Sequence, residues 1–126
     1  MKREFQLKIL VVDDSKIGRM SVIKSLDIVK PDADIFQAVN GLEAVEIFKK
    51  ERPDVVFLDL TMPVMDGYEA LKQIMAIDKK AQVIVVSADI QNEAKLRVLA
   101  VGAKNMYPKP INDEVILQIF KQDLSV

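Results

Sequence analysis

The chain has 126 residues, a length that fits one domain, and its 50% hydrophobic and 29% charged composition is typical of globular proteins. The formal net charge of −1 predicts neither a nucleic acid nor a membrane surface as a partner. The absence of cysteine and histidine excludes disulfides, cysteine or histidine metal sites, and catalysis by a histidine of this chain. No apolar run approaches the ~18 residues of a membrane span, and the start Met1-Lys2-Arg3 is unlike a signal peptide, so we expect a cytoplasmic protein.

The apolar run 8–12 predicts a first buried strand. Ser15 then provides a side chain that can cap a helix, and apolar residues recur at near-helical spacing up to about Val29. The side chains that we expect this helix to turn toward the core are Ile17, Met20, Ile23 and Leu26. Pro31 ends the helix, and residues 34–38 are expected to form a short second strand.

The turn signal Asn40-Gly41 predicts the start of a second helix over residues 42–51. Pro53 precedes the apolar run 55–58, which is too short for a helix and therefore predicts a third, buried strand. This strand ends at Asp59, and ligands of open α/β sheets bind outside the carboxyl ends of the strands. Asp59 is therefore expected to direct a charge toward the usual place for chemistry.

The second half of the chain repeats the same alternation. A loop over 62–67 leads to a third helix, and the apolar run 82–86 predicts a fourth strand. A fourth helix ends at Gly102, and a weaker strand over 104–108 precedes the last helix. The apolar residues that mark these three helices are Tyr68, Leu71, Ile74 and Met75; Ile90, Ala94, Val98 and Val101; and Val115, Ile116, Ile119 and Phe120.

Strands and helices thus alternate five times without an internal repeat or a linker. This pattern predicts an α/β fold with one five-stranded parallel sheet, doubly wound so that helices cover both faces. Periodicity does not reveal the strand order, but five strands suit the flavodoxin-like order 2-1-3-4-5. We expect residues 1–126 to form a single domain.

Four of the expected strands end in groups that suit phosphoryl transfer. These groups are Asp13 and Asp14 after the first strand, Asp59 after the third, Ser87 after the fourth and Lys109 after the fifth. In a parallel sheet these ends meet at one edge, where neighbouring carboxylates raise one another's pKa unless a cation binds. Mg²⁺ fits such a site because it takes one or two carboxylates, keeps several waters and prefers a phosphate oxygen. Lys109 and Ser87 can both contact phosphoryl oxygens.

Each of these residues has a simpler explanation when it is taken alone. Asp59 and Ser87 are of types common in turns, an Asp-Asp pair suits a helix N-terminus, and an isolated lysine is usually solvated. Because all of them are expected at one edge of one sheet, coincidence is the weaker explanation.

The same residues carry a resemblance to a known family. The motifs are Asp59-x-x-Met62-Pro63-x-Met65-Asp66-Gly67, Asp13-Asp14, Ser87-Ala88 and Lys109-Pro110. Over about residues 8–122 the chain resembles a response-regulator receiver domain of the CheY-like kind. The resemblance implies that Asp59 is the phosphoacceptor, that Lys109 contacts the phosphoryl group, and that Ser87 moves to hydrogen-bond it.

The resemblance also implies a Mg²⁺ site. Asp14 and Asp59 would be direct ligands, Asp13 would act largely through water, and the backbone carbonyl of Thr61 would be a further ligand. The Lys109-Pro110 peptide is expected to be cis.

A receiver accepts its phosphoryl group from the phosphohistidine of a sensor histidine kinase and later loses it to water. It therefore needs no histidine of its own, and we expect no enzymatic activity beyond this self-phosphorylation and dephosphorylation. Phosphorylation would change the binding of a downstream protein at the face formed by the fourth helix, the fifth strand and the fifth helix. The candidate contacts on this face are Gln91, Lys95, Leu99 and Met106.

One position departs from the family pattern. Receivers often carry Tyr or Phe three residues before the site lysine, where this chain has Met106. Tyr107 is adjacent, but neighbouring residues of a strand face opposite sides of the sheet, so it is a poor substitute. We therefore expect switching through Ser87 and the loop before the fourth helix, without an aromatic rotamer change. Thr61 and Asp89 flank the site, where they would gate the water that removes the phosphoryl group.

Alternative functions stay open at this point. With no output domain after the last helix, the chain is expected either to bind a target or to pass its phosphoryl group to another histidine protein in a phosphorelay. An aspartyl-phosphate phosphatase needs an acid/base aspartate two residues after the nucleophile, where this chain has Thr61. A nucleotide or flavin site would need a glycine-rich phosphate loop, which does not follow the first strand.

Overall fold

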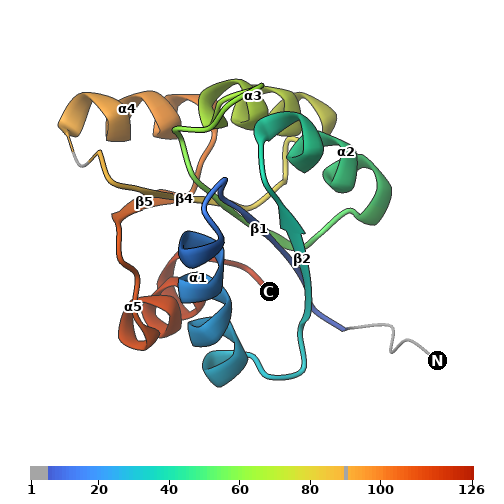
Figure 1. Ribbon diagram of the computed structural model, residues 1–126, viewed down its shortest axis with the longest axis vertical. Helices are drawn as coiled ribbons and strands as arrows, with labels where there is room; N and C mark the ends of the chain where they lie inside the picture. The colour runs from blue at the N-terminus through green and yellow to red at the C-terminus, as the bar shows by residue number, and fades with distance from the viewer. Residues whose placement is uncertain (1–5, 90) are drawn as a thin grey trace.

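The computed structural model describes residues 6–89 and 91–126 as a parallel sheet covered by helices on both faces (Figure 1). The strands are β1 (Lys8–Val12), β2 (Asp34–Ala38), β3 (Val55–Leu58), β4 (Val83–Ser87) and β5 (Asn105–Pro108). Their order in the sheet is β2-β1-β3-β4-β5, and every neighbouring pair is parallel. The predicted fold class and the predicted flavodoxin-like strand order are confirmed.

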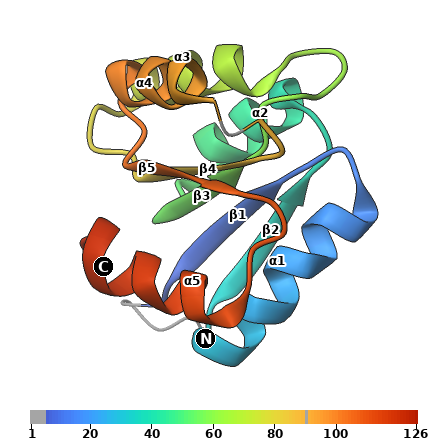
Figure 2. The same ribbon diagram turned by 90° about the vertical axis from the view of Figure 1, so that its left-hand side faces the viewer.

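The helices connect successive strands and divide between the two faces. They are α1 (Lys16–Val29), α2 (Gly41–Glu51), α3 (Gly67–Ile77), α4 (Asn92–Val101) and α5 (Asp113–Gln118), and α5 continues into the π-helical turn η1 (Ile119–Asp123). The turned view shows α2, α3 and α4 on one side of the sheet and α1 and α5 on the other (Figure 2). None of the helices in the described part of the chain is long and apolar enough to cross a membrane.

Two apolar clusters hold these layers together, because successive strand residues face opposite sides of the sheet. Leu10, Val56 and Val85 face α2, α3 and α4. Ile9 and Phe57 face the opposite side, in the cluster that includes residues of α1 and α5. The three central strands have nearly no exposed surface, as expected for parallel strands covered on both faces.

Side-chain caps set the first turn of four helices, all at the carboxyl ends of strands. The N-cap residues are Ser15, Asn40, Asp66 and Asn112, and each accepts a hydrogen bond from a backbone N–H three residues later. Helix α4 differs, because its N-cap residue Gln91 makes no side-chain capping bond. The start of α4, which follows the loop that we expect to change on switching, therefore lacks the side-chain cap that the other four helices have.

The predicted inward face of α1 is partly wrong. Ile17 is 84% exposed and Met20 is 37% exposed, whereas the helix buries Val22, Ser25 and Leu26. Gly18 continues this buried stripe toward the N-terminus and packs against Asp13. The error arose because the buried stripe contains glycine and serine, which carry no hydrophobic signal. Of the other predicted inward residues, Ile23 and the markers of α3 and α5 do pack on the core, and Ile90 lies outside the described residues.

Candidate functional site

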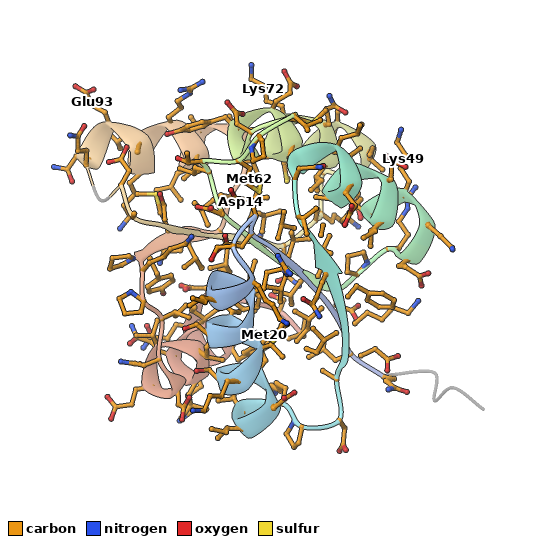
Figure 3. The ribbon with its side chains drawn as sticks, viewed as in Figure 1. Asp14, Met20, Lys49, Met62, Lys72 and Glu93 are labelled. Carbon is orange, nitrogen blue, oxygen red and sulfur yellow. The ribbon has the colours of Figure 1, made fainter. Side chains whose placement is uncertain are left out.

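The carboxyl edge of the sheet brings three carboxylates together. One oxygen each of Asp13, Asp14 and Asp59 lies within 4.8 Å of the other two. The register explains this, because Val12 of β1 is paired with Leu58 of β3, so that the next residues of the two strands are neighbours. Asp13 is 4% exposed and Asp59 is 6% exposed, while Asp14 is exposed at the end of β1 (Figure 3).

Asp13 is held by two partners from different elements. Its Oδ1 accepts a hydrogen bond from the Ser15 backbone N–H at 2.9 Å, and its Oδ2 accepts one from Lys109 Nζ at 2.7 Å. The carboxylate lies directly over Gly18, where an added Cβ would be 2.2 Å from Oδ2. Glycine at this position of α1 therefore makes room for the carboxylate.

Asp59 combines burial with one nearby cation. Its Oδ1 accepts a hydrogen bond from the Leu60 N–H at 2.9 Å, and its Oδ2 lies 3.3 Å from Lys109 Nζ. Burial raises the pKa of the Asp59 carboxyl above its ordinary value, the charge of Lys109 opposes this rise, and the charge of Asp13 adds to it. The anion is thus poorly stabilised by the protein alone, and a divalent cation would favour it.

Lys109 keeps its proton in this environment. Burial lowers its pKa, but the hydrogen bond to Asp13 and the charges of Asp59 and Asp13 outweigh burial, so the net pKa is raised. The Lys109-Pro110 peptide is cis, as expected. The backbone N–H of Lys109 donates to the backbone carbonyl of Ser87 at 2.9 Å, which ties the ends of β4 and β5 together.

Ser87 is buried at the end of β4, 2% exposed, and its hydroxyl belongs to a short hydrogen-bonded chain. The Ser87 Oγ accepts from the Asp89 N–H at 3.0 Å, and Asp89 Oδ1 accepts from the Gln91 N–H at 3.0 Å. The serine hydroxyl proton is still available for another acceptor. The predicted gate residue Asp89 thus also organises the loop that leads into α4.

The loop after β3 folds back tightly on the site. Gly67 lies against the strand end, where an added Cβ would be 2.0 Å from the carbonyl oxygen of Asp59. Met65 N–H donates to the Pro63 carbonyl at 2.8 Å, so that Val64 has a positive φ of 69° and is 78% exposed. Thr61 is exposed in this loop, next to the buried Asp59-Leu60 pair.

Arg19 of α1 is a site neighbour that we did not predict. Its Nη1 donates to the backbone carbonyl of Asp13 at 2.9 Å, and its Nε donates to the Gln37 side chain of β2 at 2.9 Å. The sequence signal was present but weak, because Arg19 follows the capping residue Ser15 by one turn of helix.

The predicted docking face is only partly a surface. Gln91, Lys95 and Leu99 are exposed before and along α4, and Leu99 lies off the buried stripe of that helix as predicted. Met106 is 8% exposed and packs in the cluster under α3 and α4, so its expected place among the surface contacts is wrong for this conformation. Tyr107 packs on the opposite cluster, which confirms that it does not replace an aromatic side chain at Met106.

A partly buried acidic cluster beside a lysine, at the carboxyl edge of a sheet of this order, is typical of a class of phosphoryl-accepting signalling domains. The chain belongs to the response regulator receiver domain family, which matches residues 9–121. Receivers are the phosphorylation-controlled modules of two-component systems, and that is the function of this chain.

Particular relatives include chemotaxis and sporulation proteins. The chain is 44% identical to the chemotaxis protein CheY of Listeria monocytogenes over 119 residues, which is 92% of this chain and 97% of the relative. It is 38% identical to the sporulation initiation phosphotransferase F of Bacillus subtilis, covering 93% of each. A solved structure of a CheX–CheY–BeF3–Mg²⁺ complex from Borrelia burgdorferi contains a chain of 35% identity, with a TM-score of 0.84 over 89% of this chain and 84% of that one.

Proposed function

We propose that Asp59 accepts the phosphoryl group and that Lys109 and Ser87 bind the phosphoryl oxygens. The observation that carries this proposal is the position of Lys109 Nζ, 2.7 Å from Asp13 and 3.3 Å from Asp59. The ammonium group of Lys109 already lies beside Oδ2 of Asp59, the carboxylate that would carry the phosphoryl group. It can follow the negative charge from the carboxylate to a phosphoryl oxygen without a large movement.

The acidic cluster fits a magnesium ion. We propose Asp13, Asp14, Asp59 and the backbone carbonyl of Thr61 as the residues that hold it, directly or through water. All of these ligands are oxygens, and the three carboxylates lie within 4.8 Å of one another, which suits a hard cation. Mg²⁺ bound there would offset the carboxylate charge and help to orient the phosphoryl oxygens. The Borrelia burgdorferi relative, solved with BeF3 and Mg²⁺, supports this assignment.

The reaction on the protein side is a displacement at phosphorus. An oxygen of Asp59 forms a bond to phosphorus while the bond from phosphorus to the donor's imidazole nitrogen breaks, and the imidazole keeps that electron pair. Lys109 stabilises the charge on the transferred group, and the hydroxyl proton of Ser87 is free to donate to one of its oxygens. Water later hydrolyses the acyl phosphate, and Thr61 and Asp89 flank its approach.

A phosphohistidine donor has to lie outside these 126 residues, because they contain no histidine. We propose a sensor histidine kinase that docks beside Lys109. A groove there is lined largely by apolar atoms of Ile17, Val22, Val86, Pro110 and Ile111. Ile17 is 84% exposed at the edge of this groove, next to the site that the donor histidine has to reach.

For the output we propose regulated binding of a target protein at the exposed residues Gln91, Lys95 and Leu99. The 44% identity to a chemotaxis CheY over nearly its whole length supports an effector. The 38% identity to a sporulation phosphotransferase keeps a phosphorelay intermediate as the second candidate. Transfer of labelled phosphoryl from this chain to a second histidine protein would identify a relay, and a phosphorylation-dependent gain in target affinity would identify an effector.

The central test is phosphorylation by a small donor. Wild-type protein incubated with acetyl phosphate and Mg²⁺ should gain the mass of one phosphoryl group, and the modification should be labile to base and to hydroxylamine, as acyl phosphates are. The Asp59→Asn variant should remain unmodified. A wild-type mass that stays unchanged, with a donor shown to phosphorylate another receiver, would refute the proposed site.

A further inference from the structure

We propose that Arg19 is a positioning residue for the magnesium site and holds the peptide that carries its first two carboxylates. This inference rests on the proposed Mg²⁺ site. It concerns a residue outside that set of ligands, since the Arg19 side chain has no oxygen and contains only hydrogen-bond donors.

The Arg19 side chain joins three elements. From α1 it donates through Nη1 to the Asp13 carbonyl at the end of β1, and through Nε to Gln37 of β2, both at 2.9 Å. Because the guanidinium group is planar and makes hydrogen bonds to two different strand ends, its orientation relative to those strand ends is fixed. Arg19 and its bond to the Asp13 carbonyl are partly buried, which limits competition from water for that bond, whereas the bond to Gln37 is exposed.

The acceptor of the first bond gives the contact its importance. The Asp13 carbonyl belongs to the peptide unit between Asp13 and Asp14, so its direction sets where the Asp14 side chain leaves the backbone. Asp13 itself has further anchors, the Ser15 N–H and Lys109. Among the described residues no group donates a hydrogen bond to the Asp14 carboxylate, so the position of this carboxylate depends on the backbone that Arg19 holds.

A charge effect would act in the opposite direction. Within the described part of the chain no ion pair of 4.0 Å or less joins Arg19 to the three carboxylates. A cation near a metal site repels Mg²⁺, so removal of this charge alone would tighten Mg²⁺ binding. Removal of a positioning contact would weaken it, because partners that orient metal ligands typically contribute about 10- to 100-fold to metal affinity. The two explanations therefore predict opposite signs.

The test is Mg²⁺ titration of the full chain by isothermal calorimetry, with ¹⁵N chemical shifts of Asp13 and Asp14 as an independent readout. The Arg19→Met variant, which keeps the aliphatic stem, should bind Mg²⁺ about tenfold more weakly than wild type. Arg19→Lys should recover part of the loss, since lysine offers a donor but cannot bridge to Gln37 in the same fork. The matched control is Lys16→Met, which removes an exposed cation from the first turn of the same helix and should leave the affinity unchanged or slightly higher.

Three results of these titrations would refute the positioning role of Arg19. An Arg19→Met affinity equal to or tighter than that of wild type would overturn the positioning role. A lower free energy of unfolding in EDTA with an unchanged Mg²⁺ affinity would do the same, because it would make Arg19 merely structural. If wild type itself binds no Mg²⁺ at millimolar concentration, the proposed magnesium site fails, and the inference fails with it.

Discussion

Replacement of Asp59 by asparagine should stabilise the metal-free protein, although it removes the proposed phosphoacceptor. Asp59 has Asp13 and Asp14 as neighbours within 4.8 Å, and the buried Asp13 repels it by about 3.5 kcal/mol at an effective dielectric constant of ~20. The exposed Asp14 carboxylate is screened by solvent and adds less. The ion pair with Lys109 at 3.3 Å stabilises the Asp59 anion by about 5 kcal/mol on the same scale. Solvent screening reduces this value, because the lysine side chain is 29% exposed. Desolvation of the anion adds to the cost, so we expect a gain of about 1–2 kcal/mol from the neutral amide.

The contribution of Asp59 to the free energy of unfolding decreases as the pH rises. Because burial raises the folded-state pKa of Asp59 above 3.8, the protonated form favours the folded state. The stability from this group is fully present below pH 3.8 and is lost as the pH rises through the raised folded-state pKa. The advantage of Asp59→Asn should therefore be largest at neutral pH and shrink toward pH 3.8.

The assay is urea unfolding followed by far-ultraviolet circular dichroism, in EDTA and in saturating Mg²⁺. In Mg²⁺ at about 100 times its Kd the wild type should gain about 2.7 kcal/mol in free energy of unfolding, and Asp59→Asn should gain less because it has lost a proposed ligand. Asp27→Asn is the matched control, since it makes the same change at an exposed position of α1 and should show neither effect. If Asp59→Asn is less stable than wild type by more than 1 kcal/mol in EDTA, the account of charge repulsion at this site is wrong.

Three further changes test individual contacts. Gly18→Ala would place a Cβ 2.2 Å from Asp13 Oδ2 and displace that carboxylate, so calorimetry should show about tenfold weaker Mg²⁺ binding. The loss is expected although alanine favours the helix by about 1 kcal/mol. An unchanged Mg²⁺ affinity would contradict the close contact between Gly18 and the Asp13 carboxylate. Val64→Gly should raise the free energy of unfolding by about 0.5–1 kcal/mol in urea, because glycine relieves the positive φ of 69°. Tyr107 hydrogen-bonds Asp123 and Asn105, so Tyr107→Phe should lower stability by about 1 kcal/mol. In the Tyr68→Phe background, phenolate absorbance of Tyr107 should rise at about pH 12, and a midpoint near 10 would refute its burial and pairing.

The site was predictable because it follows from strand ends, which the sequence marks clearly. The run 55–58 has no polar residue, so its end at Asp59 was certain to within one position, and parallel pairing brought Asp13 next to it. The contacts of Arg19 were not predictable in this way. Its acceptors are a backbone carbonyl and Gln37 on another strand, and neither partner is visible in a local pattern.

Two other features escaped prediction for physical reasons. Ser25 is buried and Gly18 is half-buried on the inward side of α1, and a hydrophobic pattern assigns such positions to the surface. The π-helical turn Ile119–Asp123 differs from an α-helix only in its hydrogen-bond partners, and apolar periodicity over five residues does not separate the two. This turn lies next to β5, because the hydroxyl of Tyr107 on that strand donates a hydrogen bond to Asp123.

The fold also constrains how a signal can leave the site. Met106 is packed in the cluster under α4 and Tyr107 faces the other cluster, so neither of these two β5 positions places an aromatic ring between Ser87 and the α4 face. Two hydrogen bonds connect Ser87 to α4. The Asp89 N–H donates to Ser87 Oγ, and the Gln91 N–H at the uncapped start of α4 donates to Asp89 Oδ1. A hydroxyl can donate to the phosphoryl group while it accepts from the Asp89 N–H, but if the Ser87 side chain rotates to bring Oγ closer to the phosphoryl group, the first of these bonds has to break or lengthen.

This connection predicts that Ser87→Ala still accepts a phosphoryl group on Asp59 but loses the chemical-shift changes along α4. Met106→Leu, which conserves volume, should cost less than about 1.5 kcal/mol and leave those changes in place. Both variants can be compared by ¹H–¹⁵N spectra with and without beryllofluoride and Mg²⁺. If wild-type spectra show no change at Asp89, Gln91 or the residues around Met106 on activation, switching does not pass through this loop. Retention of the full α4 response in Ser87→Ala would equally exclude the serine, because the signal would then reach the helix without the one hydroxyl that connects them.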